Sequence, residues 1–466
     1  MLLKNSSSNF FWALFDRGGM LLMQFIALIY LSHLVSPYDF GLIAILSIFI
    51  NLSNVLIDSG MMGALIKKKY VENIDYNTFF TYNLFFSVLI YLILFFSAPL
   101  IANFYHIPSI ILYIRILSLA IVINAFGLVQ TVKLTRDLQF KTQAIITISS
   151  QILSVLLSIV IAKMGYGIWS LIALQLLHFF FSALFLSIVN KFRLSIQFSR
   201  ESFKEQFSFG GPLLISNILM IINNNIYSSI IGKYYNAKDA GYFYQSNKLQ
   251  NTPVGIVSAV IDKVSFTMLS KAKDLKEMIT VGHDLYKYLY FVIIPIFVYF
   301  NEISEDFFIF IFGNKWIISA PIFKILCYAI IPLIIKILNR SLLKAHGETK
   351  IILALEFAIT TVGLTLLIFV VSKGLHWIAY SIVLNSIIIA ILSSFFVKIK
   401  LEYGMLSQFS IIVRPLILSV LSLIIVDSLF CWINLDSLIE GILKFIFYFI
   451  FIIIFNIKFL KKMLIK

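Results

Sequence analysis

The stretch that decides the fold covers residues 10–69 and reads FFWALFDRGGMLLMQFIALIYLSHLVSPYDFGLIAILSIFINLSNVLIDSGMMGALIKKK. It holds two apolar runs, joined by the short turn Ser-Pro-Tyr-Asp-Phe-Gly at residues 36–41. The second run ends in Asp-Ser-Gly at residues 58–60, and lysines follow at 67–69. Because a helix needs about 20 apolar residues to cross a bilayer, the stretch predicts two membrane-spanning helices with a hairpin between them.

Composition extends this prediction to the whole chain. Of the 466 residues, 60% are hydrophobic and 13% are charged, and the mean hydropathy is +0.97. A water-soluble globule cannot bury that much apolar surface, so we expect an integral membrane protein. The apolar runs are continuous rather than alternating, which indicates helices and not the strands of a barrel.

The predicted fold class is all-α, with fourteen transmembrane helices. The first run is too long for a cleaved signal peptide, and no small-residue cleavage site follows it. The expected spans lie at residues 10–33, 40–60, 78–101, 109–132, 143–162, 166–189, 208–232, 241–267, 284–303, 317–339, 351–372, 375–397, 410–430 and 438–457.

Orientation follows from the lysines and arginines between these spans. They are concentrated in the loops on the side that holds the N-terminus, and the expected loops of the other side hold only Lys163, Lys233, Lys238, Lys315 and Lys373. The positive-inside rule therefore places both termini in the cytoplasm. The net charge of +15 is then mainly a topology signal and an attraction to anionic lipids. No basic soluble domain is expected, so we predict no nucleic-acid partner.

A repeat divides the chain. Asp39 and Gly41 recur as Asp239 and Gly241, at an offset of 200. Other pairs recur at offsets slightly above 200: Asp58 with Asp262, Arg115 with Lys324, Lys141 with Lys350, Lys163 with Lys373, and Trp169 with Trp377. This pattern predicts two six-helix units at residues 1–195 and 196–400, related by an axis along the membrane normal, and two additional helices with a basic tail at 401–466.

Four motifs in this order resemble a known family. They are Ser-Pro-Tyr-Asp-Phe-Gly at 36–41, Asp-Ser-Gly at 58–60, Arg-Asp-Leu-Gln-Phe-Lys at 136–141, and Ile-Ile-Gly at 230–232 followed by Ala-Gly-Tyr at 240–242. The chain resembles the Wzx-type flippases, the polysaccharide-transporter branch of the multidrug, oligosaccharidyl-lipid and polysaccharide exporter superfamily. It departs from many relatives at Tyr227, where they carry an acidic residue.

This resemblance implies two six-helix bundles around a central cavity that alternates between inward-open and outward-open states. The implied cargo is an undecaprenyl-diphosphate-linked oligosaccharide, a repeat unit of O-antigen, lipopolysaccharide, capsule or exopolysaccharide, moved to the outer leaflet of the cytoplasmic (inner) membrane. Membrane lipids, a polysaccharide polymerase and a chain-length regulator are the implied partners. No cofactor is expected, although transport is open to coupling with a proton or sodium gradient or with the membrane potential.

Polar side chains inside the expected spans are the candidate binding groups. A charged group facing lipid at a helix centre costs about 2.5–3.5 kcal/mol, so the many charged groups here predict a wet cavity. Ser47, Asn51, Asn54 and Asp58 recur at steps of three and four, which places them on one helix face. The predicted substrate-binding residues are Arg17, Gln24, Asn51, Asn54, Arg115, Asn217, Asn224, Asn251 and Lys324.

Among these residues, the cations Arg17, Arg115 and Lys324 are expected to contact the diphosphate, since a guanidinium offers a fork of donors to phosphate oxygens. The carboxylates that we consider for ion coupling are Asp16, Asp58, Asp262 and Glu356. Structural interpretations stay open for several groups. Asp16 and Arg17 fit a local ion pair, Asn217 and Asn224 fit bridges between helices, and Arg136 and Lys141 fit anchors of a loop.

Enzymatic functions have little support in the sequence. The six histidines show no metal-ligand spacing, and no Gly-x-x-x-x-Gly-Lys-Ser/Thr loop occurs, so we expect neither a metal site nor ATP hydrolysis. A membrane glycosyltransferase or polysaccharide polymerase is one alternative, with Asp39 as its carboxylate, but the expected outer loops are short. A drug or cation exporter of the same superfamily is the other, and a purely structural scaffold fits the polar faces least well.

Overall fold

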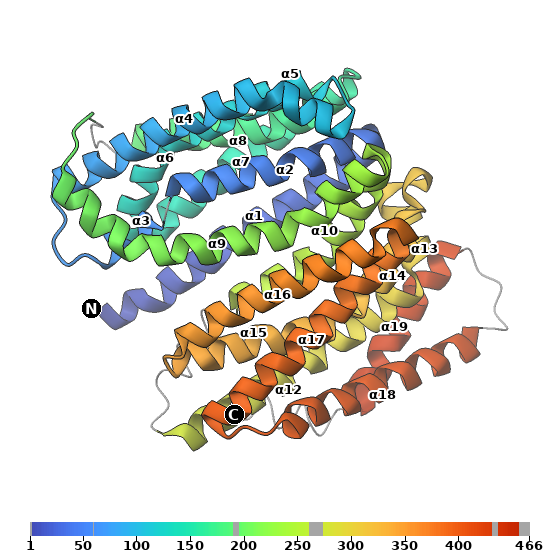
Figure 1. Ribbon diagram of the computed structural model, residues 1–466. Helices are drawn as coiled ribbons and strands as arrows, with labels where there is room; N and C mark the ends of the chain where they lie inside the picture. Colours follow the sequence, from blue (N-terminus) through green and yellow to red (C-terminus); the bar gives the residue numbers. More distant parts are fainter. Residues whose placement is uncertain (1, 59, 190–194, 261–273, 431–436, 456–466) are drawn as a thin grey trace. The chain divides into compact units, whose positions relative to one another are not determined.

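The computed structural model describes residues 2–58, 60–189, 195–260, 274–430 and 437–455, which form helices and short connections without any strand (Figure 1). Long apolar runs become helices because only a helix satisfies its own backbone groups away from water. The first ten helices are α1 (Leu2–Leu34), α2 (Pro37–Asp58), α3 (Met61–Lys67), α4 (Asn73–Tyr105), α5 (Ile110–Leu117), α6 (Leu119–Arg136), α7 (Phe140–Lys163), α8 (Ile168–Val189), α9 (Arg200–Tyr234) and α10 (Ala237–Val260).

The remaining helices follow after residue 273. They are α12 (Leu275–Glu302), α13 (Ser304–Phe312), η2 (Asn314–Trp316), α14 (Ser319–Cys327), α15 (Ile330–Ala345), α16 (Thr349–Val370), η3 (Val371–Lys373), α17 (Leu375–Leu401), α18 (Met405–Phe430) and α19 (Ser437–Phe455). The all-α class is therefore confirmed for the described part of the chain.

Eleven helical stretches among the described residues are long and apolar enough to cross a membrane, and a twelfth span results if α14 and α15, bent by 48°, are taken together. Two expected spans do not qualify. The run at 241–267 begins in α10, which is rich in Gln, Ser and Asn, and its residues after 260 lie outside the described part of the chain. In α19 the apolar stretch found among the described residues, Leu443–Ile454, is too short for a span. The count of fourteen spans and the two six-helix bundles thus stay predictions.

The described chain divides into two compact units. Unit 1 contains Met1–Lys248 and Leu367–Leu375, and unit 2 contains Leu249–Leu366 and His376–Lys466. This division follows contacts rather than sequence repetition. The repeat boundaries that we expect after residues 195 and 400 therefore stay a prediction.

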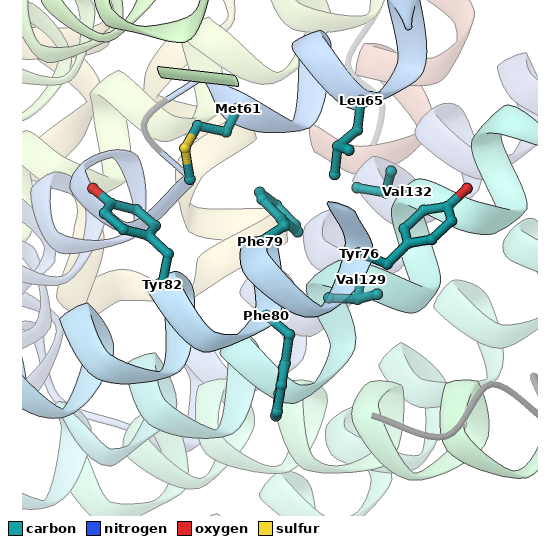
Figure 2. Packing of buried hydrophobic residues seen from close by; sticks show 8 residues of the cluster. All are labelled: Met61, Leu65, Tyr76, Phe79, Phe80, Tyr82, Val129 and Val132. Atoms are coloured by element: carbon teal, nitrogen blue, oxygen red, sulfur yellow. The ribbon is translucent and has the colours of Figure 1, made fainter. Parts of the chain in front are cut away.

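Unit 1 packs α2 against α9, α1 against α7, and α8 against both α6 and α7. Figure 2 shows a cluster of buried side chains from α3, α4 and α6: Met61, Leu65, Tyr76, Phe79, Phe80, Tyr82, Val129 and Val132. Phe203 of α9 packs against the same cluster. The start of α9 is thereby held against the beginning of α4.

The Asp-Ser-Gly motif explains why α3 begins where it does. Gly60 has a φ of +69°, a left-handed conformation that costs glycine little. A Cβ on Gly60 would lie 2.6 Å from the carbonyl oxygen of Gly210 in α9. Glycine is therefore required here both for the turn and for the close approach of α9.

Unit 2 is held together by buried polar side chains as well as by packing. Tyr286 of α12 donates to Asn339 of α15 over 2.5 Å, and the Asn339 amide donates to Ser393 and Ser394 of α17 over 3.1 Å. Ser394 in turn donates to Gln408 of α18 over 2.9 Å. Four helices thus share one hydrogen-bonded chain, which fixes their register in an apolar surrounding.

Candidate substrate-binding site

The repeated turn caps a helix in both of its copies. The Ser36 hydroxyl donates to the Asp39 carboxylate over 2.7 Å and accepts from the Asp39 backbone N–H. Asn236 and Asp239 form the same reciprocal pair at the start of α10, with both distances 2.8 Å. Because the Asp39 carboxylate is engaged in this capping box, it serves the helix start and not catalysis.

The two glycines of the repeat lie against each other. A Cβ on Gly41 would lie 1.5 Å from the carbonyl oxygen of Ala237, and a Cβ on Gly241 would lie 1.9 Å from that of Pro37. We call this contact the glycine crossing. It explains the glycine of both copies, since any side chain would overlap the backbone of the other helix.

Amide side chains of α2 face the interior of unit 1. Asn51 donates from its side-chain amide to Asn225 of α9 over 3.1 Å, and Asn124 of α6 donates to Asn54 over 3.2 Å. The sequence predicted the face of α2 that carries Asn51 and Asn54. It missed both partners, although the run of three asparagines at 223–225 was a signal for the partner on α9.

The other expected substrate-binding residues of α1, α9 and α10 differ in exposure. Gln24 and Asn217 are half-buried, whereas Arg17, Asn224 and Asn251 are exposed. Arg17 on α1 is therefore an exposed cation within a candidate span. Its expected contact with the diphosphate stays a prediction.

Arg115 has a structural partner on α4. Its Nε donates to the carbonyl oxygen of Phe95 over 3.1 Å, and its guanidinium lies 4.2 Å from the centre of the Phe95 ring. Phe95 precedes Pro99 by four residues, and a proline cannot donate the helical hydrogen bond to that carbonyl. Arg115 thus satisfies a carbonyl that the proline leaves without its usual donor.

Lys324 lies exposed on α14, where its backbone carbonyl accepts a hydrogen bond from Asn301 over 2.7 Å. Because Arg115 and Lys324 belong to different units, a shared phosphate contact between them stays a prediction.

The four carboxylates considered for ion coupling have different surroundings. Glu356 on α16 is buried and pairs with Arg340 over 3.3 Å and with Lys336 over 3.6 Å, both on α15. Asp58 accepts a hydrogen bond from the backbone N–H of Met62, and its buried Oδ1 has no hydrogen-bond partner among the described residues.

The other two carboxylates give less information about ion coupling. Asp16 is half-buried on α1, and Asp262 lies outside the described residues. Glu356 and Asp58 therefore differ in their partners. Glu356 is neutralised by two cations, whereas Asp58 has a backbone partner alone among the described residues.

A polar network at the beginning of α9 was missed by the sequence interpretation. Asp75 of α4 accepts from Ser202 of α9 over 2.6 Å and from Lys68 over 3.1 Å, and Lys68 also donates to Glu205 over 2.7 Å. Gln206 donates to the backbone carbonyl of Asp75 over 3.2 Å. We call these five residues the polar clasp.

Lys68 lies between two spans, and hydrogen bonding to Glu205 and Asp75 raises its pKa. The pKa of Lys68 is raised in the folded state, so its pairs stabilise the fold fully below the usual lysine pKa of about 10.4. This stabilisation is lost as pH rises through the raised pKa. The Lys68 pairs of the polar clasp are therefore intact throughout the physiological range.

Arg136, from the third family motif, anchors a loop. Its guanidinium donates to the carbonyl oxygens of Leu65, Lys68 and Lys69, at 2.6 Å for Leu65 and 2.9 Å for Lys69. Lys141 lies 5.5 Å from the ring centre of Trp12. These contacts favour the structural interpretation of both residues. Within the described residues, no three side chains are grouped as a metal site.

Long apolar helices that enclose amides and ion pairs are typical of a multi-spanning membrane protein. The comparisons with known proteins name its family. The polysaccharide biosynthesis protein family matches residues 30–321, and the chain belongs to this family.

Curated relatives cover most of the chain. The teichuronic acid biosynthesis protein TuaB of Bacillus subtilis (strain 168) is 24% identical over 371 residues, which is 79% of this chain and 77% of that protein. The succinoglycan biosynthesis transport protein ExoT of Rhizobium meliloti (strain 1021) is 24% identical over 69% of this chain and 66% of its own length. The lipopolysaccharide biosynthesis protein WzxC of Escherichia coli (strain K12) is 23% identical over 64% of this chain and 61% of its own.

Solved structures show the same fold. The lipid II flippase MurJ in an inward closed conformation matches with a TM-score of 0.77 at 16% identity, over 98% of this chain and all of that one. An inward-facing multidrug transporter of the MATE family, in the MOP superfamily, matches with a TM-score of 0.68 at 15% identity, over 82% of this chain and 94% of that one. Family and fold together confirm the resemblance noted from the sequence, and they identify a transporter rather than an enzyme.

Proposed function

We propose that the chain is a flippase that moves a polyprenyl-diphosphate-linked oligosaccharide from the cytoplasmic to the outer leaflet by alternating access. The observation that carries this proposal is the amide-bearing face of α2 inside unit 1, in a chain of the polysaccharide biosynthesis family. TuaB, ExoT and WzxC, which are named for polysaccharide biosynthesis or its transport, support the same cargo class.

The amides suit a sugar because each offers donors and an acceptor at once. The side chains of Asn51 and Asn54 bond to those of Asn225 and Asn124. A sugar hydroxyl replaces such a partner with a similar hydrogen bond, so the net cost of exchange is small. The α2 face thus binds an oligosaccharide with an affinity low enough to allow its release.

The diphosphate needs cations, and Arg17 is the best placed of the three that we expected. It is exposed on α1, whereas the Arg115 guanidinium is held by Phe95. We therefore assign the first phosphate contact to Arg17, and the contact predicted for Lys324 stays a prediction. The polyprenyl chain stays in the surrounding lipid.

Location follows from the charge distribution. The lysines and arginines between the spans support a multi-pass protein of the cytoplasmic (inner) membrane with both termini in the cytoplasm. Contact with a polysaccharide polymerase and a chain-length regulator belongs to the same proposal, since the flipped repeat unit is their substrate.

For ion coupling we propose Asp58 as the proton-carrying carboxylate. Its Oδ1 is buried without a partner in the described chain, so gaining a proton there breaks no hydrogen bond. Glu356 is less suitable because Arg340 and Lys336 stabilise its charge. Asp58→Asn is expected to abolish the response of transport to a pH gradient, and Asp137→Asn, at an exposed position, is the matched control.

Export in cells tests the main proposal. In cells deleted for the gene, the wild-type chain is expected to restore surface polysaccharide, and Arg17→Gln is expected to leave the lipid-linked repeat unit on the cytoplasmic side at an unchanged protein level. Lys141→Gln, which removes a cation outside the proposed site, serves as the control. Full export by Arg17→Gln would remove Arg17 from the site. Export of a drug cation instead of the repeat unit would favour the multidrug alternative.

A further inference from the structure

Unit 2 contains a basic cavity that the proposed transport path does not use. It has a volume of about 270 Å³ and lies between α12 and α18. His283 and Lys287 line it from α12, and Ser410 and Arg414 line it from α18. Three of these four side chains are basic, and the fourth is a hydroxyl, so the cavity is suited to an anion with oxygen acceptors.

Each of the two helices carries a proline near the cavity. Pro415 on α18 lines the cavity, and Pro295 on α12 lies one turn beyond the lining residue Phe291. A proline inside a helix removes a backbone hydrogen bond and bends the helix locally.

Helix length places the cavity in the N-terminal half of both spans, about 10 Å inside the hydrocarbon core. α12 has 28 residues and is about 42 Å long, whereas the hydrocarbon core is about 30 Å thick. Lys287 lies about 18 Å from the start of α12, and Arg414 lies about 14 Å from the start of α18. Long basic side chains at this depth reach the headgroup region. Lysines at 276, 398 and 400 near these helix starts indicate the cytoplasmic leaflet.

An apolar cavity continues along the same two helices. It has a volume of about 250 Å³ and is lined by Ile294 and Phe297 from α12 and by Leu416 and Val420 from α18. These residues directly follow the basic cavity in both helices. A cationic end and an apolar continuation toward the membrane interior match the two parts of a lipid molecule.

We propose that the space between α12 and α18 is a binding site for a phosphate-bearing lipid. The phosphate contacts Lys287 and Arg414, and the hydrocarbon chains occupy the apolar cavity. His283, which bonds to Tyr403 through Nδ1 over 3.0 Å, donates to the phosphate from Nε2. Basic pockets between transmembrane helices on the cytoplasmic side bind lipid headgroups by the same chemistry. The site is independent of the proposed flipping function, since a resident lipid would hold α12 and α18 together whatever the cargo is.

Two lipids share this chemistry: an anionic phospholipid of the surrounding membrane and a polyprenyl diphosphate. We expect the phospholipid to be the occupant, because long basic side chains extend toward the nearer membrane surface, where phospholipid headgroups are abundant. The test uses the full-length protein, purified and stripped of lipid in detergent. Phosphatidylglycerol, cardiolipin, phosphatidylcholine and undecaprenyl diphosphate are added separately, and binding is measured by native mass spectrometry and by the shift in melting temperature.

The expected result is binding of phosphatidylglycerol and cardiolipin at least about tenfold tighter than that of phosphatidylcholine, as expected for charge-assisted hydrogen bonds. Lys287→Gln combined with Arg414→Gln is expected to abolish this preference. The matched control, Lys276→Gln with Lys398→Gln, changes two exposed lysines outside the cavity and is expected to keep it. If undecaprenyl diphosphate alone binds through Lys287 and Arg414, the phosphate site stands and its occupant is the cargo lipid.

Equal binding of phosphatidylglycerol by the wild type and by the Lys287→Gln, Arg414→Gln variant would overturn the proposal. Equal binding of anionic and neutral lipids by the wild type would do so as well. A salt titration of the wild type needs no variant and covers the case in which the double variant does not fold. The preference is expected to weaken as ionic strength rises, because salt screens basic side chains that extend toward the membrane surface, and a preference unchanged by salt would also contradict the site.

Discussion

The two ends of α9 in unit 1 are fixed by different means. Near its C-terminal end, the glycine crossing joins the starts of α2 and α10 through backbone atoms, at Gly41 and Gly241. At its N-terminal end, the polar clasp joins α9 to α4 through side chains around Asp75. The helix between them has 35 residues and is about 52 Å long, so the two contacts lie far apart.

The difference shows which end can move at low cost. The glycine crossing depends on close packing, and opening it loses contacts that nothing replaces within the membrane. The polar clasp is made of hydrogen bonds and ion pairs, which water at the membrane surface can replace with a small net change in free energy. We therefore expect a transporter with this fold to move α9 at its clasp end.

Gly41→Val disrupts the glycine crossing, the more rigid of the two contacts, and has the largest expected effect. The new Cβ would overlap the backbone carbonyl of Ala237. A backbone atom cannot move aside by a change of rotamer. We expect a loss of at least about 3 kcal/mol of folding free energy, or no folded protein. The measurement is the melting temperature and the monodisperse fraction in detergent. Gly18→Val, at a glycine with open space, is the control, and equal stability of the two variants would contradict the account.

Asp75→Ala breaks the centre of the polar clasp and has the next largest effect. Asp75 is buried and accepts from Ser202, Lys68 and the backbone of Glu72. Removing it leaves buried donors without a partner, which costs about 1–3 kcal/mol. Limited proteolysis at the beginning of α9 is expected to accelerate, while the glycine crossing remains intact. Unchanged proteolysis would mean that Asp75 does not hold α9.

The hydrogen bond between Asn51 and Asn225 lies between the two ends of α9 and tests how firmly that part of the helix is held. Changing each to leucine, singly and together, gives a double-mutant cycle for one hydrogen bond inside the bundle. We expect a coupling of about 0.6 kcal/mol, since such bonds exchange easily within a membrane protein. A coupling of several kcal/mol would indicate a rigid link, and the amide face of α2 would then be structural.

Glu205→Gln is the smallest test. Glu205 is exposed and meets Lys68 at the protein surface, where an ion pair contributes about 0.2–1 kcal/mol. The melting temperature is expected to change little. If this variant destabilises the chain as much as Asp75→Ala does, the polar clasp depends on the surface pair rather than on its buried carboxylate.

The sequence predicts the class, the repeated turn and the polar face of α2, because each of these depends on local spacing. It also pairs Gly41 with Gly241 by their positions in the repeat. That the two glycines touch each other depends on how the repeats are arranged in space, which spacing along the chain does not contain.

The rest of the site depends on contacts between distant segments. Helical periodicity selects Asn224, but the structure pairs the neighbouring Asn225 with Asn51, because the rotation of α9 about its axis is set by packing. The contact of Arg115 with the Phe95 carbonyl, one helical turn before Pro99 of α4, also depends on packing between helices. Its predicted phosphate contact stays a prediction. Asp75 and Ser202 are separated by 127 residues, and nothing in either local pattern links them.

Reconstituted transport tests the central claim most directly. The purified chain is placed in liposomes with a labelled undecaprenyl-diphosphate oligosaccharide, and the label that reaches the opposite leaflet is measured over time with an impermeant glycosidase. We predict movement well above that of protein-free liposomes, and a rate reduced at least tenfold by Asn51→Ala with Asn54→Ala at unchanged folding. Movement no faster than in protein-free liposomes, with folded protein present, would contradict the account.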